Sequence, residues 1–228
     1  MRRDKQNSLC ARVALLDLDL EFGNVAVLLD LRPERTLAHL AGVSVAELDE
    51  DTFAPLLVEH ASGVRVMVGA GAPEQAELVT ISTVQQSIER LRDEADYVLV
   101  DTPRSFSEVN LAALDMADVI WLVSTPHLTA LKATADCLRV LEQIQVPMGG
   151  LLHVLNQTAP RGLDPAHVTA VLGRNPDANI PYTPRFDDAA NAGRPLVTTH
   201  PAEGGAVAIR ELAARLMSLT PSPGEVRA

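Results

Sequence analysis

Lysine is almost absent from this sequence. Of its 19 cationic residues only Lys5 and Lys132 are lysines, and the other seventeen are arginines. Several enzyme chemistries that act on phosphate groups need a lysine at a fixed place in a glycine-rich loop. Neither lysine has a glycine beside it, and the first glycine of the chain is Gly23. This scarcity therefore limits the enzyme classes to which the chain can belong.

Other scarcities exclude whole classes of function. Aromatic residues make up 3% of the chain, which disfavours a platform on which nucleic-acid bases stack. Acidic residues outnumber basic ones by 30 to 19, and the net charge of −11 argues against nucleic acid or an anionic membrane as the main partner. No apolar run reaches the roughly 18 residues of a membrane span, and no secretory signal follows Met1. Cys10 and Cys137 match no metal-binding spacing, so we expect a cytoplasmic protein.

What the sequence does contain is typical of a packed globular domain. Hydrophobic residues make up 47% of the 228 residues, and neither an internal repeat nor a dividing linker is evident. We expect one domain over residues 12–218. A poorly ordered segment over 1–11 and a flexible tail over 219–228, which is rich in proline, flank it.

Short apolar runs alternate with helical patterns along the chain. The runs are nearly continuous, as in strands that are buried on both faces. This alternation predicts an α/β fold with a mainly parallel sheet covered by helices on both sides. The predicted strands are Arg12–Asp17, Val64–Val68, Tyr97–Asp101, Val119–Ser124, Leu151–Asn156 and a short one at Asn179–Ile180. The predicted helices are Val79–Glu94, Phe106–Ala117, Leu128–Gln145, Asp164–Leu172 and Gly205–Ser218.

Polar residues gather where the predicted strands end. The first strand ends in Asp17-Leu-Asp19, the third in Asp101 and the fifth in Asn156. Ligands bind outside the carboxyl ends of the strands in sheets of this kind. A single aspartate there is most often a helix cap, but three carboxylates at one rim suit Mg²⁺ held mostly through water beside a phosphate.

Six segments of the chain follow one another in a recognisable order: 13–31, 96–106, 117–126, 154–157, Ile180-Pro181 and 192–196. In this order they resemble the MinD/ParA family of deviant P-loop ATPases, and more narrowly its branch of CpaE- and TadZ-like pilus-assembly proteins, with 96–106 as the Walker B strand and the loop after it. The resemblance spans residues 12–218 and implies a three-layer α/β/α P-loop fold that lacks its first strand, phosphate loop and first helix.

The resemblance implies roles for residues at this rim, with ATP and Mg²⁺ as cofactors. Asp101 would hold Mg²⁺ through water, and Asp19, with Asp17, would position the attacking water. Thr102 and Pro103 would belong to the loop that senses the γ-phosphate. Asn156 would bind the adenine edge, with the backbone near Pro181 closing the base pocket. Metal, water placement and charge neutralisation at one rim are what phosphoryl transfer requires.

The family's phosphate loop, Lys-Gly-Gly-x-Gly-Lys-[Ser/Thr], has no counterpart in this sequence. Sixteen residues precede Asp17 and contain no glycine, and the loop at 68–73, with Gly69 and Gly71, contains no lysine. Backbone N–H groups and lysines of that loop hold the phosphates in the family. We therefore expect ATP binding and hydrolysis to be impaired or lost. Truncation of the sequence is the preferred explanation, with true loss of the loop as the alternative.

The sequence also allows a role that does not depend on ATP hydrolysis. Family members form nucleotide-linked dimers and dock protein partners, so the alternative is an inactive scaffold or localisation module, possibly a homodimer, in a pilus-assembly or localisation system.

A phospho-receiver domain would need a lysine and a proline where Leu155-Asn156-Gln157 stands, and no Gly-x-Gly-x-x-Gly supports a dinucleotide site. No nucleophile–base pair is evident, and His127 is expected to open a helix. The amphipathic segment 208–217 is charge-balanced and predicts a packing helix rather than a membrane anchor.

Overall fold

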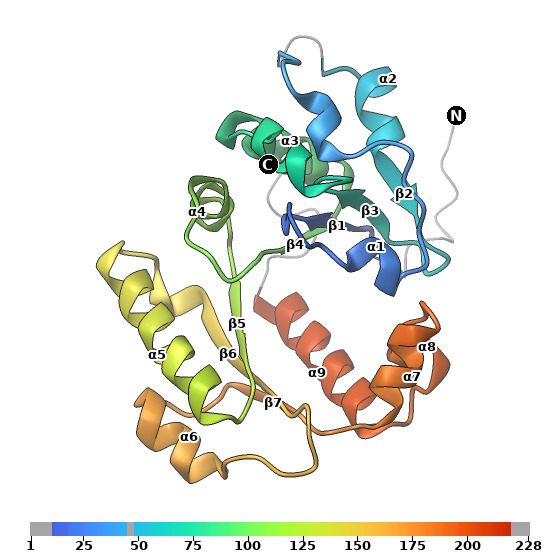
Figure 1. Ribbon diagram of the computed structural model, residues 1–228. Helices are drawn as coiled ribbons and strands as arrows, with labels where there is room; N and C mark the ends of the chain where they lie inside the picture. The colour runs from blue at the N-terminus through green and yellow to red at the C-terminus, as the bar shows by residue number, and fades with distance from the viewer. Residues whose placement is uncertain (1–10, 45–47, 220–228) are drawn as a thin grey trace. The chain divides into compact units, whose positions relative to one another are not determined.

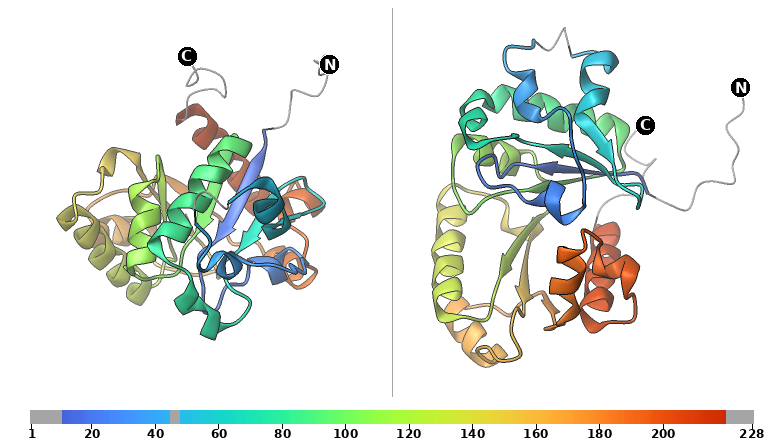
Figure 2. Two further views of the ribbon diagram at one scale, coloured as in Figure 1. Left: turned by 90° about the horizontal axis from the view of Figure 1, so that it is seen from above. Right: turned by 45° about the vertical axis from the view of Figure 1, so that its right-hand side comes forward.

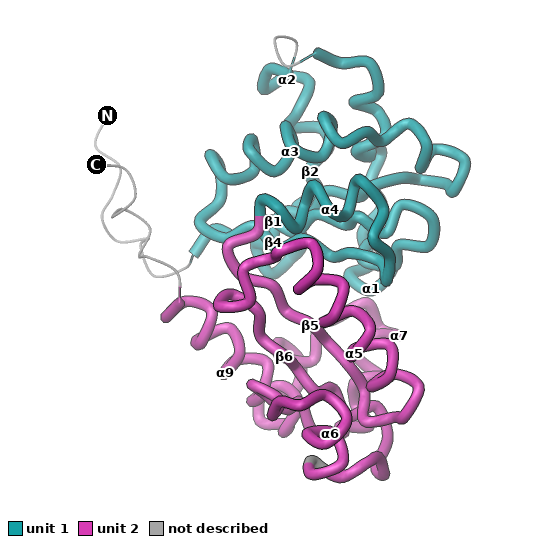
Figure 3. The backbone as a smooth tube through the Cα atoms, turned by 90° about the vertical axis from the view of Figure 1, so that its left-hand side faces the viewer, with its two compact units in different colours: residues 1–116 teal, residues 117–228 magenta. Residues whose placement is uncertain are grey.

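The computed structural model describes residues 11–44 and 48–219. The chain divides into two compact units, residues 1–116 and 117–228, which are described separately (Figure 3). Apart from residues 11 and 219, the segments expected to be poorly ordered lie outside the described residues.

Unit 1 is built on a four-stranded sheet in the order β2-β3-β1-β4 (Figure 1). Strand β1 lies between β3 and β4 and runs parallel to both, and the short β2 pairs with β3 in antiparallel sense. Register places Asp17 opposite both Val68 and Asp101, at the carboxyl ends of the three parallel strands. The strands are β1 (Val13–Asp17), β2 (Leu57–Glu59), β3 (Arg65–Val68) and β4 (Tyr97–Asp101).

Helix α3 (Ile81–Glu94) covers one face of this sheet (Figure 2), and α4 (Glu108–Asp115) packs beside it. Thr80 begins α3, since its hydroxyl accepts the Thr83 N–H. Val84, Ile88 and Leu91 lie at helical spacing and join Leu16 in the main core of the unit. A smaller core on the other face joins α1 (Val25–Leu28) to β3.

The remaining elements of unit 1 are short and were not predicted. They include β2 and the helical turns η1 (Leu37–Leu40), α2 (Glu50–Phe53), η3 (Ala54–Leu56) and η4 (Pro73–Leu78). Each has too few residues to show a periodic pattern. Leu37 and Phe53 are nevertheless fully buried, so this segment contributes to the core.

Unit 2 contains a three-stranded parallel sheet in the order β5-β6-β7. The central strand β6 is buried along nearly its whole length, and α5 and α6 pack against each other. The strands are β5 (Ile120–Ser124), β6 (Leu151–Asn156) and β7 (Ala178–Ile180). The helices are α5 (Leu128–Gln143), η5 (Met148–Gly150), α6 (Pro165–Leu172), α7 (Arg185–Asn191), α8 (Leu196–Thr199) and α9 (Gly204–Leu219).

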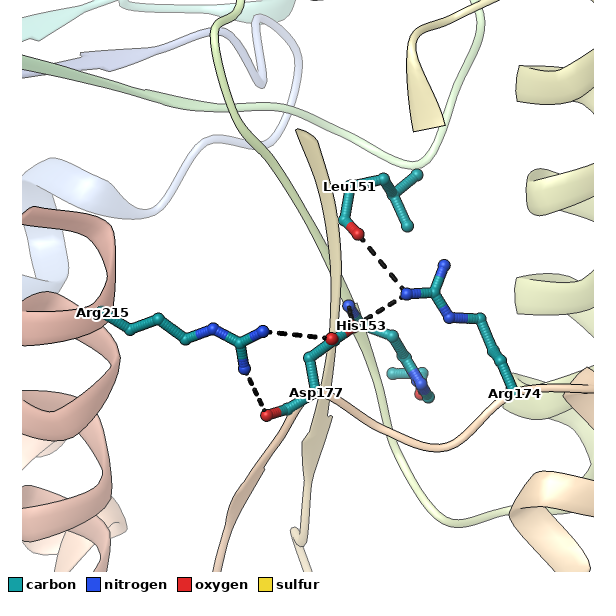
Figure 4. A network of polar contacts seen from close by, with 6 residues as sticks. Leu151, His153, Arg174, Asp177 and Arg215 are labelled. Atoms are coloured by element: carbon teal, nitrogen blue, oxygen red, sulfur yellow. Dashed lines mark hydrogen bonds and ion pairs between the residues drawn. The ribbon is translucent and has the colours of Figure 1, made fainter. Parts of the chain in front are cut away.

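Asp177 joins three elements at the amino end of this second sheet. Figure 4 shows its carboxylate between Arg174 and Arg215, with nitrogen–oxygen distances of 2.8 and 3.2 Å. The same carboxylate accepts the His153 N–H at 2.8 Å, and Arg215 also donates to the Asp177 carbonyl at 2.7 Å. The network therefore connects β6, the segment before β7, and α9.

All the strands and helices predicted from the sequence are present, with ends within two residues of those expected. The sequence pattern suggested one mainly parallel sheet, whereas the described strands form two hydrogen-bonded sheets, one in each unit. Strand β4 ends the first sheet and β5 ends the second, because no strand among the described residues pairs with their outer edges.

Candidate functional site

Three acidic residues meet at the carboxyl edge of the sheet of unit 1, as the sequence predicts. Asp17 and Asp101 are register partners on β1 and β4. The Asp19 N–H donates to Asp17 Oδ1 at 3.0 Å, and Asp19 Oδ1 accepts the Phe22 N–H at 3.1 Å. Asp17 is 1% exposed, whereas Asp101 is exposed, so Asp101 is the more accessible of the two register partners.

Two glycines allow the backbone to pack closely around Asp17. A Cβ on Gly23 would lie 2.6 Å from Asp17 Oδ2, and a Cβ on Gly69 would lie 2.5 Å from the Asp17 carbonyl oxygen. Any larger residue at these positions would force the loops away from β1. The carboxylate of Asp17 thus anchors the loop that follows β1.

The acidic group is poor in compensating positive charge. Burial raises the pKa of Asp17 to about 6. The hydrogen bond from the Asp19 backbone offsets only part of this effect, and the Asp101 carboxylate raises the pKa further. Burial, and then the charge of Asp19, also raise the pKa of Asp101. The charges that act on both carboxylates are therefore those of other carboxylates.

The fit of this edge to Mg²⁺ rests on one carboxylate. Among residues 11–44 and 48–219, no group of three or more His, Cys, Asp or Glu side chains is arranged to hold a metal ion. Mg²⁺ is usually bound by one or two carboxylates together with water and substrate phosphates. The exposed Asp101 suits that mode, whereas the Asp17 carboxylate accepts a hydrogen bond from the loop backbone. The assigned roles of Asp101, Asp19 and Asp17 stay predictions.

Thr102 and Pro103 begin the loop between β4 and α4. Thr102 is exposed, and the Pro103 carbonyl accepts the Ser105 N–H at 2.8 Å. Asn110, which is 2% exposed, donates from Nδ2 to the Ser105 carbonyl at 3.2 Å and to its hydroxyl at 2.8 Å. Sequence reasoning missed Asn110, although an amide among the apolar residues of a helix was the available signal. Its side chain fixes the loop to α4.

Replacing Asn110 with alanine is expected to lower the free energy of unfolding by roughly 1–2 kcal/mol, since two hydrogen bonds of a buried amide are lost. Faster amide exchange at Ser105 should accompany the loss, measured by hydrogen exchange. Gln85→Ala, on an exposed position of α3, is the matched control and should change neither quantity. Equal exchange at Ser105 in both variants would contradict a role for Asn110 in holding the loop.

The two residues assigned to adenine binding lie side by side in unit 2. Asn156 ends β6 opposite Ile180 of β7, and Pro181 follows directly. The Thr183 hydroxyl donates to the Pro181 carbonyl at 3.2 Å and accepts the Gly205 N–H at 3.0 Å, so the start of α9 is fixed to this segment. Sequence reasoning missed Thr183, because its partners are known only from the fold.

The histidines add no nucleophile–base pair at these edges. His127 is exposed and precedes α5, with Nδ1 3.2 Å from the Thr125 hydroxyl. His153 Nε2 lies 2.7 Å from Ser124 Oγ, but both residues are buried between β5 and β6. Burial, and then the charge of Arg174, lower the pKa of His153, which favours the neutral ring. This pair is a contact of the core.

The candidate residues therefore form two groups, each within one unit. Asp17, Asp19, Asp101 and the following Thr102-Pro103 belong to residues 1–116, while Asn156 and Pro181 belong to residues 117–228. The structure brings together the members within each group.

Comparison with known proteins shows sequence relatives along most of the chain. The chromosome-partitioning ATPase Soj of Thermus thermophilus is 28% identical over 217 residues, which cover 91% of this chain and 84% of Soj. The septum site-determining protein MinD of Synechocystis is 23% identical over 212 residues, covering 90% of this chain and 77% of MinD. No family model matches the chain.

Solved structures share the fold. A ParA family ATPase of Chlorobium tepidum superimposes with a TM-score of 0.82 at 19% identity, covering 90% of this chain and 86% of that one. MinD of Pyrococcus horikoshii, in complex with Mg-ADP, gives 0.75 at 21% identity and covers 96% and 86%. A chain of the MinC:MinD cell division protein complex of Aquifex aeolicus gives 0.74 at 21% identity and covers 93% and 86%. The predicted α/β fold of the MinD/ParA P-loop type is thereby confirmed.

No helix among the described residues is both long and apolar enough to cross a bilayer.

Proposed function

We propose that this chain, which is of the MinD/ParA ATPase type by its sequence relatives and structural neighbours, serves the spatial organisation of a cellular machine. The relative Soj is a chromosome-partitioning ATPase, and the relative MinD is a septum site-determining protein. Within this type we place the chain nearest to the CpaE- and TadZ-like pilus-assembly proteins, on the resemblance of its segments 13–31 and 96–106. Its partners are then proteins of a localisation or pilus-assembly system.

The nucleotide chemistry of the chain is proposed to be weakened. The observation that carries this proposal is the acidic edge of unit 1, where Asp17 and Asp101 are register partners. Burial raises the pKa values of both carboxyl groups, and the neighbouring charges that raise them further are those of other carboxylates. Phosphate sites of this type rely on lysines in a glycine loop, and neither Lys5 nor Lys132 has a neighbouring glycine. A triphosphate at this edge would meet carboxylates without the cations that neutralise it.

When bound, Mg²⁺ would neutralise phosphate charge beside Asp101. The protein's own residues would then place the nucleotide. By the family resemblance, Asn156 would offer its amide to the adenine edge and the backbone near Pro181 would close the base pocket. The exposed Thr102, with Pro103, would belong to the loop that senses the γ-phosphate. Asp19, with Asp17, would orient the water.

Isothermal titration of this 228-residue chain with Mg-ATP is expected to give no saturable heat at micromolar concentrations. Asp101→Asn removes an exposed carboxylate and should raise the affinity for metal-free ATP relative to Asp51→Asn, an exposed acid elsewhere in unit 1. Micromolar binding of Mg-ATP by the unchanged chain would refute impaired binding and leave the MinD/ParA type intact.

A scaffold without a nucleotide switch is the second candidate. The absence of lysine from any glycine-rich loop of the sequence favours it. Light scattering with and without Mg-ATP distinguishes the two, because a nucleotide switch must shift the population of a dimer, whereas a passive scaffold keeps one molar mass.

A further inference from the structure

One histidine is completely buried in the sheet of unit 2. His153 lies in the central strand β6, opposite Leu122 of β5, and is 0% exposed. Its ring Nε2 lies 2.7 Å from Ser124 Oγ, and Ser124 is itself buried. Its ring Nδ1 is also buried and has no hydrogen-bond partner among the described residues. Only one of the two ring nitrogens therefore has a polar contact.

The neutral ring suits this environment, whereas the charged ring does not. In the imidazolium form both ring nitrogens carry a hydrogen and act as donors. Nε2 would then donate to Ser124 Oγ, but the hydrogen on Nδ1 would have no acceptor within the described part of the chain. Burying a charge without hydrogen-bonded compensation is costly, and such a group stays neutral instead. The packing of native unit 2 therefore opposes protonation of His153.

The charged groups that act on the ring come from the segment before β7. Burial lowers the pKa of His153 most, the charge of Arg174 lowers it further, and the charge of Asp177 raises it. The Asp177 carboxylate accepts the backbone N–H of His153, and it also pairs with Arg174 and with Arg215 of α9 (Figure 4). This carboxylate is therefore already shared among three donors.

Helices α5 and α6 bury no charge against this face of β6. Leu131 of α5 and Val168 of α6 join Leu155 of β6 in one core. His153 lies two residues before Leu155, so its side chain points to the same face of the strand. The buried residues of α5 are Leu131, Thr134, Leu138 and Leu141. The titratable residues of the two helices are exposed or half-buried: Lys132, Asp136, Cys137, Arg139, Glu142 and His167.

We propose that His153 makes the sheet of unit 2 open in mild acid, because the ring takes up a proton only when β6 separates from β5 and from the helices that cover it. A histidine in an opened chain binds a proton near pH 6.5, whereas the lowered pKa keeps native His153 neutral. Below pH 6.5 the opened form therefore binds more protons than the native form, and its population rises as pH falls. The proposal does not rest on nucleotide binding.

Amide hydrogen exchange of the full chain at pH 7.5 and pH 5.5 measures this opening. After correction for the intrinsic pH dependence of exchange, the opening constant at Val154 and Leu155 should rise about tenfold, which is the ratio that one histidine with a pKa near 6.5 supplies. At Leu15 and Leu16 of β1 it should fall instead, because the raised pKa of Asp17 has the opposite sign. Equal changes in β1 and β6 would show that the whole chain opens, and would overturn the proposal.

Two glutamine variants separate His153 from the other titrating groups. His153→Gln keeps a group that can hydrogen-bond to Ser124 but does not titrate, so the pH dependence in β6 should disappear. His127→Gln, at an exposed histidine of the same unit, should retain it. Loss of the pH dependence in both variants, or in neither, contradicts a role for His153.

The unchanged chain decides the question even if His153→Gln fails to fold. The ring signals of native His153 in NMR spectra should remain those of the neutral form at pH 5.5. A native ring that titrates at pH 6.5 or above overturns the proposal, since protonation would then need no opening. A rise of less than about threefold in the opening constant of β6 between pH 7.5 and pH 5.5 overturns it as well.

Discussion

Asp17→Asn is expected to stabilise the protein at pH 7.5 by roughly 1–2 kcal/mol, the reverse of the usual effect of substituting a buried residue. The raised pKa of about 6 means that the native state must hold a buried charge at neutral pH. Asparagine keeps the acceptor for the Asp19 N–H without that charge. Part of the gain is lost because the amide NH₂ cannot accept a hydrogen bond as the second carboxylate oxygen can.

The sign of the pH dependence follows from linkage. Because the pKa of Asp17 is higher in the native than in the unfolded chain, the native state binds more protons between about pH 4 and pH 6. The Asp17 contribution thus improves as pH falls through 6 toward 4. The difference between the unchanged chain and Asp17→Asn should shrink over that interval.

Urea unfolding at pH 4.5, 6 and 7.5 measures this difference. Asp51→Asn is the control, since it removes an exposed acid from the same unit and should leave the pH profile as it is. A variant at Asp17 that is less stable at pH 7.5 by 1 kcal/mol or more would show that its hydrogen bonds outweigh its buried charge.

Asp177→Ala is expected to destabilise the protein by roughly 2–3 kcal/mol, because three donors from separate elements lose one acceptor. The side chains of Asp177, Arg174 and Arg215 are 22%, 31% and 40% exposed, so solvent screens the pairs and the loss stays below that of a fully buried network. Asp136→Asn, in the exposed pairs with Lys132 and Arg139, is the control and should leave the free energy of unfolding nearly unchanged, because solvent screens these pairs.

The pH dependence at Asp177 has the opposite sign to that at Asp17. Burial alone would raise the pKa of Asp177, but the His153 N–H, Arg174 and Arg215 together outweigh it and lower the pKa. Its stabilising contribution is therefore complete above the ordinary aspartate pKa near 4 and is lost as pH falls below it. Denaturant unfolding at pH 7 and pH 3 should show a large difference between Asp177→Asn and the unchanged chain at the first pH only. A constant difference would assign the effect to packing.

Long, strongly patterned elements could be predicted from the sequence alone. Tyr97–Asp101 and Leu151–Asn156 have the bounds expected of them, since apolar runs of five or six residues between turn residues leave few alternatives. The short turns η1, α2 and η3 could not be predicted, because each has too few residues to show a period. The long-range contacts that bury Leu37 and Phe53 specify these turns.

At the candidate site too, some features follow from the sequence, among them the low lysine content, and others follow only from the fold. The sequence by itself determined that no lysine lies in a glycine loop, that Asp17, Asp19 and Asp101 follow two of the predicted strands, and that the fold is a mainly parallel α/β type. Only the tertiary structure decided which aspartate is buried, because burial depends on how Gly23 and Gly69 pack around Asp17. It also decided that β1 lies between β3 and β4, since strand pairing joins residues far apart in the chain and no local pattern specifies the partner.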